Sequence, residues 1–479
     1  MSRTPFFAPK RAPALVALTA AVLLSACAAV PPAGPQPMTL PAGFAEAAPA
    51  GSIDETPRAD WWIAFADPTL DALERSVVVS NADLARALAQ LRHARAEVDL
   101  QRAGAAPQLS ADVAVDRTHT SANVVGRALA GRTVDDHAAG VAASWEPDLF
   151  GRVASQAAAA RGDAEATAAD AVSLRLALQA DVAKDYLAMR SLADEQALLK
   201  RSVADQQALL ALARQRLDDG TASELEVAQA QGEAETLQAR SVDLDTQQAT
   251  LRHALATLTG QPAATLALPD TATPSTPPAV SAGVPSDLLR RRPDIAAAAQ
   301  RVTAANARAG VARLAWFPRL VLSLAGGAES TALGPLLSLP SRAWSLGPQL
   351  ALPLFDGGRR QAELAGAQAD VDAASAAYRG TVIAAINDVE DQLATLSTLQ
   401  QEDVHQAQAV HSSTRAAEIA DVRYRVGADA YADLLLARQA NLSTRRDELL
   451  LKRRRLLATV DLVRALGGGW RASAKVDGT

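Results

Sequence analysis

The side chains best suited to catalysis or metal binding are few in this sequence, and they are not spaced as in known catalytic motifs. The 479 residues include six histidines and one cysteine. No two histidines form an HxxxH or HExxH pair, and no second thiol is present to complete a zinc site. The chain also has no Walker lysine motif, no dinucleotide-binding glycine motif and no GxSxG. We therefore expect no catalytic residue, no metal site, no cofactor and no enzymatic activity.

The single cysteine, Cys27, lies where an export signal would end. Basic residues near the start are followed by an apolar run from Ala14 to Leu24, which suits a secretory signal and is too short to span a bilayer. The run ends in Leu24-Ser25-Ala26-Cys27, which resembles the lipobox of bacterial lipoproteins, where the signal is removed before the cysteine and acyl chains are attached. This predicts a signal peptide at 1–26 and a covalent lipid on Cys27. Ala28, in place of an inner-membrane retention aspartate, favours the outer membrane.

The composition limits the remaining classes of protein. A net charge of −6 and a pI near 5.6 argue against a nucleic-acid partner. No further apolar run approaches the roughly 20 residues of a membrane-spanning helix. Hydrophobic residues make up 49% but aromatic residues only 4%, which suits long helices packed through small side chains. Prolines concentrate in residues 31–57, so we expect residues 27–60 to form an extended lipidated tether.

The sequence on the two sides of the proline-rich residues 269–285 looks duplicated. Residues 106–109 (Ala-Pro-Gln-Leu) parallel residues 317–320 (Phe-Pro-Arg-Leu), and residues 220–227 parallel residues 427–434. The matches occur in the same order and at nearly constant spacing, which favours a duplicated half-protein over a solenoid. We expect a first repeat at 61–268, a linker at 269–285, a second repeat at 286–470 and a C-terminal tail at 471–479.

Each half has the pattern helix, two strands, long helix, tip, long helix. Apolar residues occupy alternate positions between Gln108 and Asp116, and Leu320, Leu322 and Leu324 do so in the second half, as in a strand with one apolar face. An ordinary half-buried sheet would show the same pattern. Val153–Leu217 and Arg359–Val426 lack proline and could each form a helix roughly 100 Å long. A seven-residue spacing predicts coiled-coil packing beyond each tip, at Leu237, Leu244, Leu251 and Leu258, and at Leu435, Leu442, Leu449, Leu456 and Val463.

Several segments together resemble the TolC-like outer membrane factor family, specifically its NodT-type lipoprotein branch. They are Trp61-Trp62 with Phe65-Ala66-Asp67-Pro68-Thr69-Leu70, residues 283–295 (GVPSDLLRRRPDI), residues 145–152 (WEPDLFGR) and residues 354–359 (LFDGGR). The resemblance spans essentially all of the mature chain. It implies a mainly α fold with a transmembrane β part, in which a trimer forms a 12-stranded β-barrel continued by a periplasmic α-helical barrel. The implied barrel strands lie near 107–119, 137–149, 318–330 and 342–355.

The resemblance also assigns a role to the tips that join the long helices. In this family the tips close the periplasmic end of the tunnel and meet a hexameric adaptor. The implied adaptor-contact residues come from both tips: Arg216, Gly220, Thr221, Ser223, Arg423, Gly427, Ala428 and Ala430. The two glycines suit a tight reversal that requires positive φ. The alternative is that these segments are ordinary solvated turns.

A periplasmic gate is implied at four positions. Asp433 falls where the family places a ring of carboxylates, and Leu436 stands three residues later, where some members carry a second acid. Tyr424 and Glu226 match a tyrosine–acid pair that holds the closed tip in some members. The basic partner in that lock is replaced here by Asp429, so we expect that link to be missing. Asp433 as a solvated surface charge remains an alternative.

The function implied by the resemblance is that of an outer-membrane exit duct in a tripartite efflux system. A homotrimer would meet a periplasmic adaptor and an inner-membrane exporter of the resistance-nodulation-division type. It would be lipid-anchored in the outer membrane, span it and extend into the periplasm. Two other classes remain open: a periplasmic adaptor, and a coiled-coil envelope scaffold without a pore. Both fit the long helices, but neither requires two duplicated pairs of strands.

Overall fold

The computed structural model describes residues 33–46, 59–123, 130–269 and 277–470. The predicted signal peptide at 1–26, Cys27 and the tail at 471–479 lie outside the described residues. Within the described ranges no helix combines the length and the hydropathy needed to cross a membrane.

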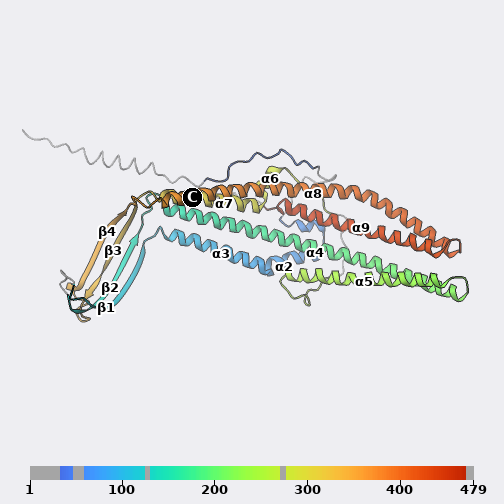
Figure 1. The fold of residues 1–479 in the computed structure, drawn as a ribbon, viewed down its shortest axis with the longest axis horizontal. Coiled ribbons are helices and arrows are strands. Elements are labelled where there is room, and N and C mark those ends of the chain that lie inside the picture. Colours follow the sequence, from blue (N-terminus) through green and yellow to red (C-terminus); the bar gives the residue numbers. More distant parts are fainter. Residues whose placement is uncertain (1–32, 47–58, 124–129, 270–276, 471–479) are drawn as a thin grey trace, which may run out of the picture. The chain divides into compact units, whose positions relative to one another are not determined.

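The same order of elements occurs twice along the chain, as predicted. Both halves contain a helix, a pair of strands and a pair of long helices (Figure 1). The first half has α3 (Ala82–Ala103), β1 (Gln108–His119), β2 (Thr133–Trp145), α4 (Arg152–Asp218) and α5 (Glu224–Leu258). The second has α7 (Pro293–Leu314), β3 (Arg319–Ser330), β4 (Arg342–Ala351), α8 (Arg359–Arg425) and α9 (Tyr431–Ala465). The described residues also contain the short elements η1 (Trp61–Phe65), α2 (Pro68–Ser80), α6 (Pro285–Arg291) and η2 (Leu339–Ser341). The repeat boundaries given above remain a prediction.

The four strands form one antiparallel sheet in the order β1-β2-β3-β4, so the two halves meet where β2 pairs with β3 (Figure 1). The register places Ala111 opposite Val141, Val141 opposite Gly326, and Gly326 opposite Trp344. Because side chains alternate along a strand, this row belongs to one face of the sheet. That face is apolar and open, with Val113 82% and Trp344 80% exposed. The opposite face of β1 carries polar side chains: Gln108, Ser110, Asp112 and Asp116.

Two of the predicted strands have different bounds in the structure. The sequence placed β2 at 137–149, but it runs from Thr133 to Trp145 because the next residues are Glu146 and Pro147, and proline cannot donate to a sheet. It placed the end of β4 near 355, but the strand ends at Ala351, two residues before Pro353. The predicted bounds of β1 and β3 are correct to within one residue.

The long helices follow the proline-free segments closely. Helices α4 and α8 have 67 residues each, which corresponds to about 100 Å at 1.5 Å per residue. The predicted heptad leucines of α5 and α9 pack inward. Leu237, Leu244 and Leu442 are buried in one apolar cluster with four residues of α4: Leu192, Leu198, Leu199 and Val203. Helices this long are therefore stabilised by lateral packing along their length rather than by a single compact core.

The chain divides into two compact units, and the dividing lines cross the long helices. The first unit contains residues 91–166 and 298–378, which include the sheet, together with residues up to 36. The second contains residues 37–90, 167–297 and 379–479, which include α5, α9 and both hairpin turns. The candidate site described below lies entirely within the second unit.

A buried polar contact organises the core of the second unit around α2. Asp67 caps this helix by accepting hydrogen bonds from the backbone N–H groups of Thr69 at 2.8 Å and Leu70 at 3.2 Å. Its other carboxylate oxygen accepts a hydrogen bond from the Tyr186 hydroxyl of α4 at 2.7 Å. About two turns further along α2, Glu74 is completely buried among apolar residues. This arrangement explains the Asp67-Pro68-Thr69-Leu70 motif as a helix cap locked to α4.

Candidate functional site at the hairpin tips

The two hairpin turns have the same local design. Gly220 and Gly427 have φ values of 72° and 78°, a conformation that favours glycine. The N–H of Thr221 donates to the Arg216 carbonyl at 2.8 Å, and the N–H of Ala428 donates to the Arg423 carbonyl at 2.8 Å. These bonds close the C-termini of α4 and α8 as Schellman motifs. The glycine prediction was therefore correct about the backbone, whereas the adaptor-contact role stays a prediction.

The chain re-enters a helix differently after the two turns. Ser223 caps α5 with a side chain that accepts from the Glu226 N–H at 3.3 Å. Ala430, at the matching position before α9, has no side-chain cap. Both turns lie together in the second unit (Figure 1).

Tyr424 and Glu226 form the contact that the resemblance implied. The Tyr424 hydroxyl donates a hydrogen bond to the Glu226 carboxylate, and so joins α8 of the second hairpin to α5 of the first. The tyrosine ring is 2% exposed and packs edge-on against Tyr431 at 5.8 Å between ring centroids. Burial, followed by the hydrogen bond to Glu226, raises the pKa of Tyr424 to about 12. The phenol is therefore a neutral donor under all physiological conditions.

Arg216 adds a second connection between the hairpins that the sequence analysis did not predict. Its guanidinium carbon lies 4.6 Å from the centre of the Tyr424 ring, within range of a cation–π interaction. The same guanidinium donates to the backbone carbonyls of Tyr424 at 3.5 Å and Arg425 at 3.1 Å. It thus binds the C-terminal end of α8, where carbonyls are left without helical partners. We name Arg216, Glu226 and Tyr424 the tip latch.

Asp429 has a partner, but the partner lies in its own hairpin. Arg423 donates to its carboxylate at 2.6 and 2.7 Å in a bidentate pair. This pairing lowers the pKa of Asp429 and raises that of Arg423. Arg425 donates to Asp421, one turn earlier on α8, at 2.7 Å.

Asp433 and Leu436 are not members of the tip latch. Both are exposed side chains on the first turns of α9, with Leu436 65% exposed. Asp433 contributes electrostatically to the raised pKa of Arg423. The structure therefore brings together Tyr424 and Glu226 but does not bring Asp433 into the same cluster. Their roles as constriction residues stay a prediction.

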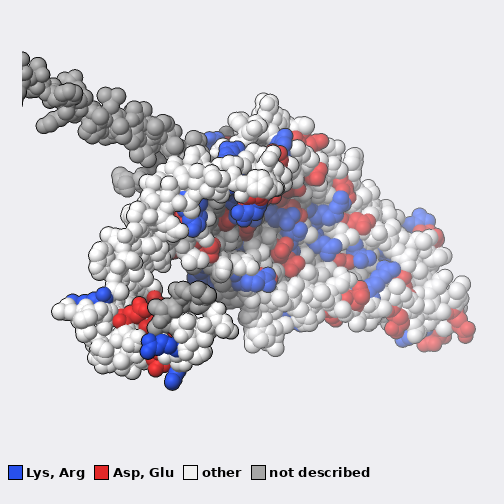
Figure 2. Space-filling model, turned by 60° about the vertical axis from the view of Figure 1, so that its left-hand side comes forward, with Lys and Arg blue, Asp and Glu red and all other residues white. Residues whose placement is uncertain are grey.

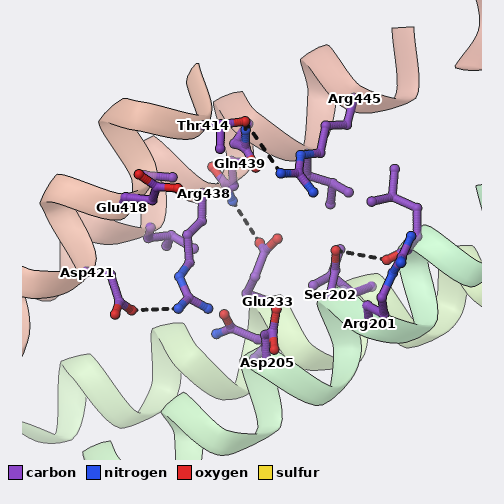
Figure 3. A pocket seen from close by; sticks show the side chains of 17 residues that line it. Arg201, Ser202, Asp205, Glu233, Thr414, Glu418, Asp421, Arg438, Gln439 and Arg445 are labelled. Carbon is purple, nitrogen blue, oxygen red and sulfur yellow. Dashed lines mark hydrogen bonds and ion pairs between the residues drawn. The ribbon is translucent and has the colours of Figure 1, made fainter. Parts of the chain in front are cut away.

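A charged groove lies between the two hairpins (Figure 3). It has a volume of about 440 Å³ and is lined by all four long helices. Arg438 of α9 donates to Asp421 of α8 at 2.6 Å, and Gln439 of α9 donates to Glu233 of α5 at 2.7 Å. Acidic and basic side chains are intermixed in the hollowed helical surface seen in Figure 2.

The groove contacts extend the connection between the hairpins away from the tip. Gln206 of α4 donates to the Tyr431 hydroxyl of α9 at 2.6 Å in a buried contact. Further along, Arg446 of α9 pairs with the buried Glu195 of α4 at 2.6 Å. The hairpins are therefore joined by a series of polar contacts rather than by the latch alone. Sequence reasoning missed these pairs because helical spacing identifies faces but not their partners.

The chain matches known proteins over nearly its whole length. The family model of outer membrane efflux proteins matches residues 75–261 and 284–468. The outer membrane protein OprJ of Pseudomonas aeruginosa is 34% identical over 461 residues, which cover 95% of each chain. The pyoverdine export outer membrane protein OpmQ of the same species is 31% identical, over 94% of this chain and 97% of that protein.

Solved structures agree with these sequence matches. The structure of the outer-membrane channel OprN superimposes with a TM-score of 0.84 at 30% identity, covering 91% of this chain and 99% of that one. The two segments matched by the family model, 75–261 and 284–468, contain α3 to α5 of the first half and α7 to α9 of the second. The chain belongs to the outer membrane efflux protein family, of the TolC-like outer membrane factors.

Proposed function

We propose that this outer-membrane protein is the passive exit duct of a tripartite efflux system. Three copies would assemble into a channel that receives small molecules from a periplasmic adaptor and an inner-membrane exporter of the resistance-nodulation-division type. The chain would need no cofactor, bind no metal and catalyse no reaction, and Cys27 would carry the lipid anchor. The named relatives include a pyoverdine exporter component, but the nature of the cargo here is left open because the exporter would select it.

The observation that carries this proposal is the sheet. It has one open apolar face and an opposite face of small and polar side chains, and within the described residues β1 and β4 each pair along one edge only. Unpaired strand edges are not tolerated in hydrocarbon, where every backbone donor and acceptor needs a protein partner. Pooling the strands of three copies would pair every edge, place the apolar faces against lipid and leave the polar faces around a water-filled passage.

The tip latch supports a closed resting state. It joins the ends of the two hairpins through a hydrogen bond to a carboxylate and a guanidinium bound to two carbonyls. Hydrogen bonds to charged groups contribute about 1.5–3 kcal/mol each. Separating the hairpins would have to break these contacts, so they would bias the channel toward closure. Adaptor binding at the tips would supply the compensating free energy.

Two measurements test the proposal. Native mass and negative-stain images of the detergent-purified protein should show three copies, and a folded monomer would exclude the channel.

Planar-bilayer recordings should then show small, infrequent openings that become larger or more frequent in Tyr424→Phe. The control is Tyr378→Phe, which removes a hydroxyl from the same helix away from the tip. Equal conductance in both variants would show that the latch is not the gate.

A further inference from the structure

Ionisable side chains on the apolar face of the sheet are confined to one end of it. This is the loop end, where β1 leads into β2 and β3 leads into β4. By their register, five ionisable residues lie on the same face as Trp344: Arg117, His119, Asp135, His137 and Arg342. The rest of this face, as far as the described strands show it, is uncharged down to Leu109 and Leu350. A face that otherwise suits hydrocarbon therefore ends in a charged border.

The opposite face of the sheet has the other sign of charge at the loop end. Its charged residues there are three acids: Asp116, Asp136 and Glu329. On the apolar face of the described strands, by contrast, the guanidinium groups of Arg117 and Arg342 outnumber the one acid, Asp135. Charges that served only to hydrate the strand ends would not need to be sorted by face in this way. The sorting indicates an anionic partner on the apolar face.

Arg117, His137 and Arg342, which we name the basic row, lie at similar distances from the loop ends of their strands. Arg117 is two residues from the end of β1, His137 is four residues from the start of β2, and Arg342 begins β4. The register from Arg117 to Arg342 runs across three strand spacings, roughly 14 Å, and along four residues of β2 (139 − 135 = 4), roughly 13 Å. A row inclined by roughly 43° in this way matches the tilt of about 35–45° found for strands in outer-membrane barrels, so it would lie level with the membrane surface.

The donors of the basic row are available to a ligand. Within the described part of the chain, the side chains of His137 and Arg342 form no hydrogen bond or ion pair. Arg117 contacts Asp135 through its Nε at 3.4 Å, and its side chain is still 75% exposed. Trp344 follows Arg342 on the same face and is 80% exposed, and a tryptophan in this place is typical of the boundary between hydrocarbon and headgroups. The basic row therefore stands at the depth of lipid headgroups, next to an apolar surface.

We propose that the basic row binds the phosphate groups of lipopolysaccharide, the phosphorylated glycolipid of the outer leaflet. Guanidinium groups bind phosphate oxygens through paired, charge-assisted hydrogen bonds, and the imidazole N–H of His137 adds a further donor. The acyl chains of the same molecule cover the apolar side chains from Trp344 downward. The inference rests on the proposed channel, which sets the apolar face against lipid. Because the long helices of that channel extend into the periplasm, the loop end faces the outer leaflet rather than the phospholipids of the inner one.

Assembly of three copies would bring two guanidinium groups together. When the open edges of the sheets pair, β4 of one copy adjoins β1 of the next, so Arg342 lies one strand away from β1 and Arg117 of the partner subunit. Both residues are within two positions of the loop ends of their strands, so they come to nearly the same level. Like charges on neighbouring strands repel each other unless an anion lies between them. A phosphate group there would offset this repulsion and stabilise the joint between subunits.

Binding is measured by native mass spectrometry of the detergent-purified trimer, titrated with lipid A and with dephosphorylated lipid A. The native protein should prefer the phosphorylated form, and Arg117→Gln and Arg342→Gln should each weaken its binding about tenfold. The control is Arg359→Gln beyond the other end of β4, because Arg359 is 73% exposed, close to the 75% of Arg117. Equal affinity for the two forms of lipid A, or equal losses in the control and the two test variants, would overturn the proposal.

Two further titrations separate charge from structure and one lipid from another. Asp135→Asn removes the acid beside Arg117 and should strengthen lipid A binding, and failure to do so would show that charge is not the basis of the interaction. Phosphatidylglycerol, added as a competitor, should displace lipid A only at much higher concentration. Displacement at equal concentration would show that the basic row binds any anionic lipid, and the assignment to the outer-leaflet glycolipid would be wrong.

The yield of heat-resistant trimer on semi-native gels shows whether each variant still assembles. A folded monomer in the native sequence would refute the channel, and the basic row with it. A native trimer that does not distinguish the two forms of lipid A would refute the basic row alone. If Arg342→Gln lowers the yield of trimer but the remaining trimer binds lipid A as the native protein does, Arg342 serves the subunit contact and its role in lipid binding is overturned.

Discussion

Glu74 should make the protein less stable as the pH rises, and its replacement by glutamine should remove that dependence. The side chain is completely buried beside Leu70, Leu73 and Val77, and neither carboxyl oxygen has a hydrogen-bond partner among the described residues. Burial raises its pKa to about 9, opposed by the charge of Arg175. The folded protein therefore holds Glu74 as the neutral acid at neutral pH.

The size of the effect follows from the two pKa values. An acid whose pKa is raised on folding stabilises the protein fully below its unfolded value of 4.5, and this contribution is lost as the pH rises to about 9. Each pKa unit corresponds to about 1.4 kcal/mol, so the whole interval corresponds to about 6 kcal/mol per chain. Glutamine has nearly the same shape and no charge, so Glu74→Gln should gain stability relative to the native protein as the pH increases.

The assay is thermal unfolding of the detergent-purified protein, followed by tryptophan fluorescence between pH 6 and 9. The melting temperature of the native protein should fall over this range, and that of Glu74→Gln should fall less. Glu235→Gln, an exposed substitution on α5, is the control and should follow the native curve. Parallel curves for the native protein and Glu74→Gln would show that Glu74 has a partner or contacts water, and the argument from burial would be wrong.

Three further substitutions test other parts of the structure. Tyr186→Phe removes the buried hydrogen bond to Asp67 and should destabilise the protein by about 1.5–3 kcal/mol in the same unfolding assay; an unchanged melting temperature would show that the helix cap is sufficient alone. Gly327→Ala would place a methyl group 2.4 Å from the backbone oxygen of Ala139, so β2 and β3 could not pair as closely. The yield of heat-resistant oligomer on semi-native gels should therefore fall. A yield equal to that of the native protein would contradict the close approach of the two strands. Asp433→Asn should reduce cation preference, measured as a smaller reversal potential in a salt gradient, and an unaltered potential would place the selectivity elsewhere.

Much of the fold could be predicted because its signals are periodic and long. The two 67-residue segments contain no proline and are rich in helix-forming residues, which favours a long helix in each. Leucines spaced by seven identify the face of each following helix that packs against its neighbours. Strand ends were less accurate because the alternation of side chains continues past the last backbone hydrogen bond. Leu352 and Leu354 fit the pattern of β4 although the strand ends at Ala351.

The site was predictable only where a family motif marked it. Tyr424 and Glu226 were paired correctly, but Arg216, Gln206 and Glu233 make their contacts across helices that the sequence cannot place side by side. Asp429 shows a different difficulty, because its partner Arg423 is six residues away around a turn. The residue type at position 429 shows that the side chain is acidic, but it does not show in which direction the side chain points.

The pairing of β2 with β3 has a consequence for how the chain folds. The hairpins β1–β2 and β3–β4 join nearby residues, whereas Trp145 pairs with Leu322 (322 − 145 = 177 positions away) and His137 with Ser330 (330 − 137 = 193 positions away). Contacts between such distant residues form slowly because a long loop must be closed first. Each half can therefore make its own two strands early, while the joint between the halves must wait until α4 and α5 have ordered. Until then four strand edges remain open, and this is the stage at which a newly exported chain would be most prone to aggregate.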